Sequence, residues 1–409
     1  MPSMLDLLSR EESWKAFYEY KTSLCCPRNV ERDLRKFIDG RGYLPVCGAI
    51  SRGEPFQLPK RTEISKLGKA KKRVVYTYPP AENTVLKLLT YLLLRRYDGL
   101  FAEGLYSFRP GRSAKDAVRR LRSADGIAGM YSYKADISDY FNSVPVPLLL
   151  PKLEKVLDGD RELYVFLRSL LQEPLVTDGN GVRRDEKGIM AGTPLSAFYA
   201  NLYLEELDRH FEEIKLPYAR YSDDIILFAG SREETERHAG YIRAFLADRG
   251  LNVNPDKERF AAPEEGWTFL GFRCVQDSVD IAPATVEKLK KKMKRKARAL
   301  RRWSDRNGAG GEKAAKAFIR IFNRKLLESP ADNELTWSYW FFPVINTDDS
   351  LRRIDRYAQD CLRYLISGRR TKARYNVRYE QLKKLGYRSL VHEYYAFPDN
   401  KSGTGEGGQ

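Results

Sequence analysis

The segment Tyr221-Ser222-Asp223-Asp224 constrains this chain most, because it places two adjacent carboxylates between two runs that are typical of β-strands. The runs are residues 217–221 and 225–229, which are rich in aliphatic and aromatic side chains. Such closely joined runs predict a hairpin with charge at its tip. Two carboxylates beside a half-buried sheet lose hydration and repel each other unless a cation compensates them. Taken alone, an Asp-Asp pair is more simply interpreted as a solvated turn. Other parts of the chain must therefore decide between a solvated turn and a cation site.

A third carboxylate, Asp136, favours the cation. It lies near the end of a strand-like run over residues 130–137, and Tyr140-Phe141-Asn142-Ser143 follows closely. Two strands that end in acidic residues can bring their carboxylates to one place. Mg²⁺ prefers one or two carboxylates together with substrate phosphates, and pairs of such ions promote in-line transfer of phosphoryl groups. Asp136, Asp223 and Asp224 are therefore predicted to be catalytic and to ligate two Mg²⁺ ions.

Composition favours a nucleic-acid partner. The 409 residues include 72 Lys and Arg against 55 Asp and Glu, a formal charge of +17, and 12% of the residues are aromatic. A basic chain with many aromatic residues suits phosphates and stacked bases. The sequence contains no apolar run long enough to span a bilayer and no signal-peptide pattern at its start, so we expect a cytoplasmic protein without a membrane partner.

The order of predicted elements indicates an α+β fold. Lys66 and Arg73 lie in a basic stretch that leads into a strand over residues 74–78, and the loop around Arg109 and Arg112 precedes a helix for which Ser113 is the expected N-cap. The remaining predicted elements are helices over 4–22, 29–39, 82–97, 146–172, 196–211 and 231–250, a hairpin at 178–181, strands at 251–254 and 267–272, and basic helices after residue 284.

These ordered motifs resemble the reverse transcriptases of bacterial retroelements, in the branch with group II introns, diversity-generating retroelements and defence-associated enzymes. The resemblance covers about residues 60–272. It implies a right-hand polymerase, with fingers and palm of antiparallel sheet and helices and an α-helical thumb. The expected divisions are an N-terminal helical extension (1–59), fingers and palm (60–275), a basic helical thumb and C-terminal cap (276–395) and a disordered tail (396–409).

The resemblance also implies roles for individual residues. Phe141, five residues after Asp136, takes the place of an aromatic ring that excludes the 2′-hydroxyl of a ribonucleotide; packing in the core is the alternative. Nucleotide-binding residues would be Lys66, Arg73, Phe141, Ala191, Gly192, Ser196 and Lys257. Primer- or template-binding residues would be Arg109, Arg112, Tyr221, Phe269, Leu270 and Gly271. Ala191 departs from the pattern, since many relatives carry Gln there.

The implied activity is RNA-directed DNA polymerisation from deoxynucleoside triphosphates, with an RNA template, such as a cognate structured noncoding RNA, and a DNA product. No DNA-binding or zinc nuclease pattern follows the thumb, which favours antiphage defence over the reverse transcriptase or maturase of a group II intron or a diversity-generating retroelement. A non-catalytic, maturase-like RNA-binding protein and a palm-fold nucleotide cyclase are further alternatives. The sequence names neither the RNA nor the primer, and priming by a protein hydroxyl stays open, as does the oligomeric state.

Overall fold

The chain divides into two compact units. The computed structural model describes residues 3–24, 26–65, 72–186, 188–328 and 336–398. The larger unit comprises residues 1–24 and 29–262, and the smaller comprises 25–28 and 263–409. The sequence-based division put residues 263–275 with the palm, whereas by contacts they belong to the smaller unit.

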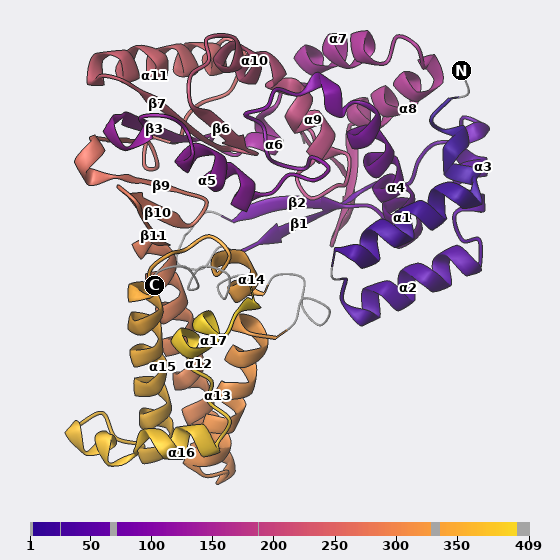
Figure 1. Ribbon diagram of the computed structural model, residues 1–409. Coiled ribbons are helices and arrows are strands. Elements are labelled where there is room, and N and C mark those ends of the chain that lie inside the picture. Colours follow the sequence, from indigo (N-terminus) through magenta and orange to yellow (C-terminus); the bar gives the residue numbers. More distant parts are fainter. Residues whose placement is uncertain (1–2, 25, 66–71, 187, 329–335, 399–409) are drawn as a thin grey trace, which may run out of the picture. The chain divides into compact units, whose positions relative to one another are not determined.

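A four-stranded antiparallel sheet carries the predicted catalytic residues of the larger unit. Its order is β6-β7-β3-β8, with β6 (Tyr218–Tyr221), β7 (Asp224–Ala229), β3 (Tyr131–Asp136) and β8 (Arg259–Ala261). The helix α11 (Arg232–Ala247) packs against β3 and β7 (Figure 1). Five of the six residues of β7 are buried, so the central strands are covered on both faces.

A second sheet of the larger unit has the order β2-β1-β4-β5. Its strands are β1 (Lys60–Ile64), β2 (Arg73–Thr77), β4 (Leu175–Asp178) and β5 (Gly181–Arg184). The β4–β5 pair confirms the predicted hairpin, and β2 confirms the strand that follows the basic stretch.

Helices surround these two sheets. The larger unit contains α1 (Glu11–Ser23), α2 (Arg28–Asp39), α3 (Leu44–Ser51), α4 (Pro80–Arg96), α5 (Ala114–Arg122), α6 (Tyr140–Ser143), α7 (Val146–Val156), α8 (Arg161–Gln172), α9 (Ser196–Tyr203), α10 (Glu205–Glu213) and α11, with short 3₁₀ turns at Asp6–Ser9, Asp98–Leu100 and Ile127–Gly129. Ser113 caps α5 as predicted, in a reciprocal capping box with Asp116.

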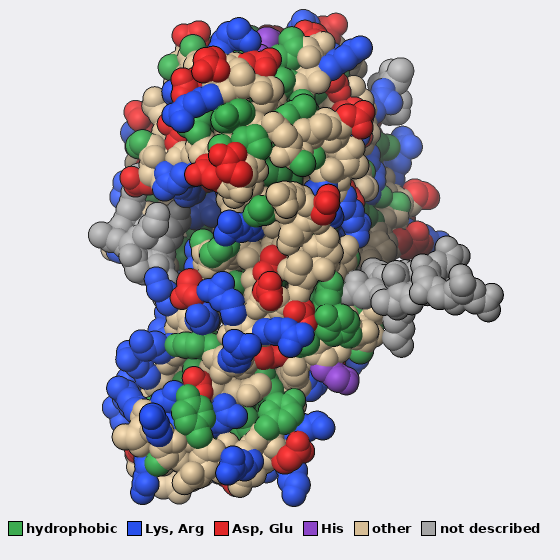
Figure 2. Space-filling view, turned by 60° about the vertical axis from the view of Figure 1, so that its left-hand side comes forward, with side chains coloured by type: hydrophobic (Ala, Val, Ile, Leu, Met, Phe, Trp, Pro, Cys, Tyr) green, Lys and Arg blue, Asp and Glu red, His purple; other side chains and the backbone are tan. Residues whose placement is uncertain are grey.

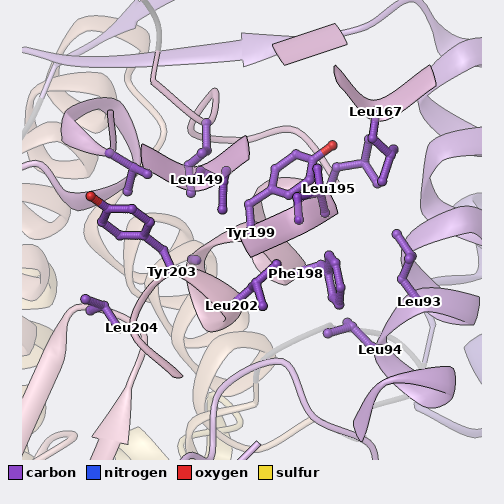
Figure 3. Packing of buried hydrophobic residues seen from close by; sticks show 14 of the residues in the cluster. Leu93, Leu94, Leu149, Leu167, Leu195, Phe198, Tyr199, Leu202, Tyr203 and Leu204 are labelled. Carbon is purple, nitrogen blue, oxygen red and sulfur yellow. The ribbon is translucent and has the colours of Figure 1, made fainter. Parts of the chain in front are cut away.

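Helix α9 lies at the centre of the hydrophobic core. Seven of its eight residues are buried, which is expected for a short helix that is surrounded by other elements. Figure 3 shows its side chains Phe198, Tyr199 and Leu202 among leucines from α4, α7 and α8. The loop before this helix is therefore attached to a buried part of the unit.

The smaller unit combines a three-stranded sheet with helices. Its sheet has the order β11-β10-β9, with β9 (Trp267–Phe269), β10 (Phe272–Val275) and β11 (Ser278–Ile281), preceded by a 3₁₀ turn at Pro263–Glu265. The helices are α12 (Pro283–Asn307), α13 (Gly311–Leu326), α14 (Trp337–Phe341), α15 (Asp349–Ser367), α16 (Tyr379–Lys384) and α17 (Leu390–Tyr395), with a 3₁₀ turn at Lys372–Asn376 (Figure 1). Of the predicted disordered tail, residues 399–409 lie outside the described residues, whereas Phe397 packs edge-on against Phe342 with ring centroids 5.6 Å apart.

Several predicted element boundaries were wrong for local reasons. The stretch 146–172 forms two helices: α7 ends at Val156, and Asp160 caps α8 by accepting a hydrogen bond from the Leu163 amide. Residues 251–254 form a single bridge, Ile137 to Val253, and β8 supplies the fourth strand instead. The predicted helix over 196–211 is divided into α9 and α10, and α3 was not predicted.

In the part of the chain that the structure describes, no helix is both long and apolar enough to cross a lipid bilayer.

Candidate active site

The hairpin between β6 and β7 positions two of the three predicted metal ligands. Tyr221 and Asp224 are the last paired residues, so Ser222 and Asp223 form a two-residue turn, and Asp224 begins β7 instead of lying at the tip. Ser222 has a φ of 61°, a left-handed conformation that usually belongs to glycine. The turn thus has two residues, one fewer than the predicted runs left between them. Asp223 lies in the turn, whereas Asp224 lies in the strand.

Strand β3 brings the third carboxylate to the same place. Asp136, its last residue, is the Cα partner of Asp224 across the β3–β7 ladder. The next amide, of Ile137, donates a hydrogen bond of 2.9 Å to the Asp223 carbonyl. Sheet register alone therefore brings the three acidic residues together, although 87 positions separate Asp136 from Asp223 in the sequence (223 − 136).

Electrostatics couple these three carboxylates. Burial raises the pKa of Asp223, the charges of Asp136 and Asp224 raise it further, and Lys257 opposes them. The Lys257 ammonium forms an ion pair with Asp136 Oδ2, and Lys134 Nζ lies 3.5 Å from Asp224 Oδ1. Two lysines thus offset part of a charge that the fold concentrates.

The donor chemistry of the three carboxylates fits Mg²⁺, which binds oxygen ligands. Among the residues that the structure describes, however, no group of three His, Cys, Asp or Glu side chains is arranged closely enough to hold a metal ion. Burial and mutual repulsion favour a cation here, and ligation by all three residues stays a prediction.

A buried ion pair between Arg220 and Asp208 stabilises the hairpin. The side chains of Arg220 and Asp208 are both 0% exposed, and Arg220 Nε donates to Asp208 Oδ1 at 2.7 Å. Burial lowers the pKa of Arg220, but Asp208 more than offsets that effect, so the pKa is raised overall. Arg220 also donates to the Ser222 carbonyl at 3.3 Å, and Tyr218 donates to Asp208 at 2.8 Å. The turn is therefore attached to a charge pair that was not predicted.

Hydrogen bonds between Ser107, Asn201 and Ser222 hold the turn from a second side. The Ser222 amide donates to Ser107 Oγ at 2.8 Å, and that hydroxyl donates to Asn201 Oδ1 at 3.2 Å. Asn201 Nδ2 returns a bond of 2.9 Å to the Ser107 carbonyl. Sequence reasoning missed these residues, although Asn201 within the otherwise apolar helix α9 was an available signal, as was Arg220 within a buried strand.

Phe141, the predicted sugar gate, lies just beyond β3. It belongs to the four-residue helix α6, which begins after Asp139 in the left-handed region with φ 46°. The Tyr140 hydroxyl anchors this helix by donating to the Ala200 carbonyl at 2.6 Å. The Phe141 side chain is partly buried, its carbonyl accepts from the Ile189 amide at 2.9 Å, and its ring meets that of Phe108 edge-on with centroids 6.4 Å apart.

The loop over residues 188–196 packs onto β2. The Ala191 carbonyl accepts a 2.8 Å hydrogen bond from the Tyr76 amide, and the Ala191 amide donates to Asn142 Oδ1 at 3.3 Å. Gly192, with φ 98°, lies so close that a Cβ atom would be 3.1 Å from the Tyr76 carbonyl oxygen. Ser196 donates to the Thr193 carbonyl at 2.7 Å. Ala191 and Ser196 are buried, and main-chain hydrogen bonds of Ala191 hold this loop against β2 and Asn142, so the contact of both residues with nucleotide stays a prediction.

Comparison with known proteins decides the family. Residues 58–274, about half of the chain, match the family described as reverse transcriptase (RNA-dependent DNA polymerase). The chain belongs to this reverse transcriptase family. The matched segment contains all three carboxylates, Phe141 and the loop over residues 188–196.

Two curated relatives are similar to parts of this chain. The 91 kDa protein in the cob intron of Schizosaccharomyces pombe is 29% identical over 174 residues, which cover 42% of this chain and 21% of that protein. The COX1/OXI3 intron 2 protein of Saccharomyces cerevisiae is 22% identical over 251 residues, covering 47% of this chain and 29% of that protein. The matches span less than a third of either relative.

Solved structures are similar at low identity. A telomerase from Candida albicans in complex with a TWJ fragment of telomeric RNA has a TM-score of 0.44 and 12% identity, with 83% of this chain and 68% of that chain covered. The RNA-dependent RNA polymerase of a human picobirnavirus has a TM-score of 0.39 and 17% identity, with 54% and 43% covered.

The basic residues predicted to bind nucleotide or nucleic acid differ in their placement. Arg73 is exposed at the start of β2, where it can meet a ligand, and Lys66 lies outside the described residues. Arg112 is half-buried and donates to both the carbonyl and the carboxylate of Glu103. The prediction that Arg109 faces nucleic acid is corrected. Its side chain is 3% exposed and binds the Asp98 carboxylate at 2.8 Å, so it stabilises its own loop.

The predicted primer-binding residues lie in both units. Tyr221 is half-buried at the end of β6, and burial raises the pKa of its hydroxyl. Leu270 and Gly271 form the β9–β10 turn of the smaller unit, with φ of 50° and 89°. Phe269 is fully buried beside this turn, so its side chain supports the hairpin, and only the turn itself is available to a primer.

Proposed function

We propose that this protein is an RNA-directed DNA polymerase that makes complementary DNA on an RNA template. One observation carries the proposal: Asp136 is paired with Asp224 across β3 and β7, with Asp223 in the adjoining β6–β7 turn, inside the segment matched to reverse transcriptases. Three coupled carboxylates at the end of a buried sheet suit nucleotidyl transfer and are costly in a purely structural protein. A catalytically inactive RNA-binding protein would not need them.

Asp136, Asp223 and Asp224 would hold two Mg²⁺ ions. When bound there, the ions supply activation of the primer 3′-hydroxyl and neutralise charge on the triphosphate. Lys257, whose ammonium forms an ion pair with Asp136, would neutralise or protonate the departing pyrophosphate. Arg73, exposed on β2, would bind the triphosphate, and the ring of Phe141 would exclude a 2′-hydroxyl from the nucleotide site.

The helical part of the smaller unit offers a surface for the RNA template. Residues 285–303 of α12 include ten Lys or Arg and one Glu. Figure 2 shows lysine and arginine side chains gathered over this part of the molecule, with hydrophobic side chains between them. A pocket of about 320 Å³ is lined by residues of α12, α15 and the segment 370–374, among them the basic and tyrosine side chains of Lys294, Arg298, Tyr357, Tyr364, Arg370 and Arg374 and one carboxylate, Asp360, which pairs with Arg374. Cations beside aromatic faces suit a phosphate with its base.

Two biological settings follow for this polymerase. Antiphage defence, with a cognate noncoding RNA as template, rests on the sequence resemblance. The setting of an intron-encoded reverse transcriptase or maturase is favoured by the names of both curated relatives, which are intron proteins. Sequencing the RNA and DNA that copurify with the protein separates them: intron RNA supports the second setting, and one unrelated structured RNA supports the first.

Primer extension tests the activity itself. Purified protein, a homopolymer RNA template with a DNA primer, deoxynucleotides and Mg²⁺ should give extension that is lost when Asp223→Ala and Asp224→Ala are combined. Arg209→Met, which removes an exposed ion pair on α10, is a matched control that should keep activity. An inactive wild type, or extension that survives the double substitution, would reject the proposal.

A further inference from the structure

Phe108 combines two features that folding alone does not explain. Its φ is 60°, which is unusual for a bulky residue, and 40% of its surface is exposed. A strained backbone and an exposed ring both cost free energy. Such strain persists where the surroundings over-determine it, and it concentrates at functional sites.

The two neighbours of Phe108 fix its backbone. Ser107 is fully buried and shares hydrogen bonds with Asn201 and with the Ser222 amide of the hairpin turn. Arg109 is buried on the other side and donates to Asp98 and to the Ala102 carbonyl at 2.7 Å. Phe108 therefore has little freedom to move away from the position that these anchors impose.

This imposed position places the ring of Phe108 against that of Phe141. The two planes cross at 78° with centroids 6.4 Å apart, within the range of favourable edge-to-face pairs. The backbone of Phe141 is held independently, because Ile189 donates to its carbonyl and Gly188 lies against it, where a Cβ atom would be 2.6 Å from the carbonyl oxygen. The backbone does not fix the orientation of the ring, which lies 5.5 Å by centroids from the ring of its neighbour Tyr140, and Phe108 contacts it from a different segment of the chain.

We infer that Phe108 is a positioning residue that holds the Phe141 ring in the orientation that excludes a 2′-hydroxyl. The inference rests on the proposed polymerase function and extends it to a residue outside the site predicted from the sequence. An edge-to-face pair of aromatic rings contributes enough to change a selectivity by about two- to tenfold. The loss of Phe108 should therefore lower sugar discrimination without removing activity.

The test compares single-nucleotide incorporation of a deoxynucleotide with that of its ribonucleotide. The ratio of the two kcat/KM values should fall about two- to tenfold in Phe108→Leu and stay near the wild-type value in Phe108→Tyr, which keeps the ring. Phe108→Gly relieves the strained φ and should lose discrimination as Phe108→Leu does. Phe260→Leu is the matched control: Phe260 is 37% exposed and its ring lies 4.8 Å from that of Tyr133.

A double-mutant cycle shows whether Phe108 acts through Phe141. If it does, Phe108→Leu should change the ratio very little in a Phe141→Ala background. An unchanged ratio in Phe108→Leu, an equal change in Phe260→Leu, or additive effects in the cycle would each overturn the inference. An inactive wild type would instead overturn the proposed function, so the two failures are distinguishable.

Discussion

Replacing Arg220 by Met should be among the most destabilising substitutions in the larger unit. At the 2.7 Å separation of Arg220 Nε and Asp208 Oδ1, an effective dielectric constant of about 20 gives an attraction of about 6 kcal/mol. Desolvation of both groups offsets much of this attraction. Removing one partner leaves a charge buried without its counterion, which costs about 3–5 kcal/mol. This loss is a large fraction of the stability of a typical domain.

Two companion variants separate this effect from packing. Arg220→Met combined with Asp208→Leu removes both charges and should recover most of the loss. Arg209→Met breaks the exposed pair with Glu205 and should cost less than about 1 kcal/mol.

Hydrogen exchange of the β6–β7 amides, measured by mass spectrometry on the whole protein, reports the local free energy of opening. Urea unfolding followed by circular dichroism gives a second measure. A cost in Arg220→Met no larger than that in Arg209→Met, or a double variant no more stable than the single one, would refute the buried ion pair. Because Arg220 also binds the Ser222 carbonyl, the double variant should regain stability but lose activity by about tenfold, the effect of one charged hydrogen bond.

Three further predictions concern charge and hydrogen bonding. Asp223→Asn should abolish extension yet raise the urea midpoint at pH 7. Burial raises the pKa of Asp223, so its ionisation costs stability above that pKa. The stability gained by Asp223→Asn should therefore vanish below the ordinary pKa of Asp. Tyr140→Phe should lose about 1–2 kcal/mol of unfolding free energy, because it removes a buried hydrogen bond. Tyr199→Phe should lose no stability, because the Tyr199 hydroxyl has no partner among the described residues. Thermal unfolding of the two variants compares these costs. Lys294→Ala and Arg298→Ala should each weaken RNA binding and lower the slope of log K against log salt by about 1 in a filter-binding titration; unchanged slopes would remove this pocket from the RNA surface.

The sequence was sufficient to predict the strands β3, β6 and β7 and the approach of their acidic residues. Runs rich in apolar and aromatic residues on both sides of Asp223 and Asp224 predicted a hairpin, and β6 and β7 confirm it. Asp136 was predicted as the end of another strand, and antiparallel pairing places it opposite Asp224. These features depend on local periodicity and on turn length, which a single sequence contains.

The buried polar contacts could not be predicted in the same way. Arg109 belongs to a loop that reads as exposed, but its partners Asp98 and Ala102 become neighbours only when the chain folds back on itself. Ala191 and Ser196 belong to a loop with glycines, yet β2 and α9 bury them. Long-range contacts, not local composition, decide which polar residues of a loop become internal supports.

Left-handed backbone conformations at non-glycine residues recur on the segments that carry this site. Ser222, Phe108, Asp139 and Met190 all have φ between 46° and 61°. Each adjoins a residue with a proposed role or a buried anchor: Ser222 precedes Asp223, and Phe108 lies between Ser107 and Arg109. Such conformations cost about 1–3 kcal/mol each, so the surrounding hydrogen bonds must offset them.

The arrangement of strain and support has a mechanical consequence. The residues proposed to act on substrate lie at strand ends and on short segments next to them, and their anchors, Arg220, Asn201 and Tyr140, are buried in the core of the larger unit. A turn whose neighbours are fixed by buried hydrogen bonds has few alternative conformations, which limits how far its carboxylates and rings can move. A substitution at an anchor should therefore disturb rate and stability together, whereas one at a strained position such as Phe108 should change selectivity with little loss of stability. Comparing both quantities in Phe108→Leu and Arg220→Met tests this division of roles directly.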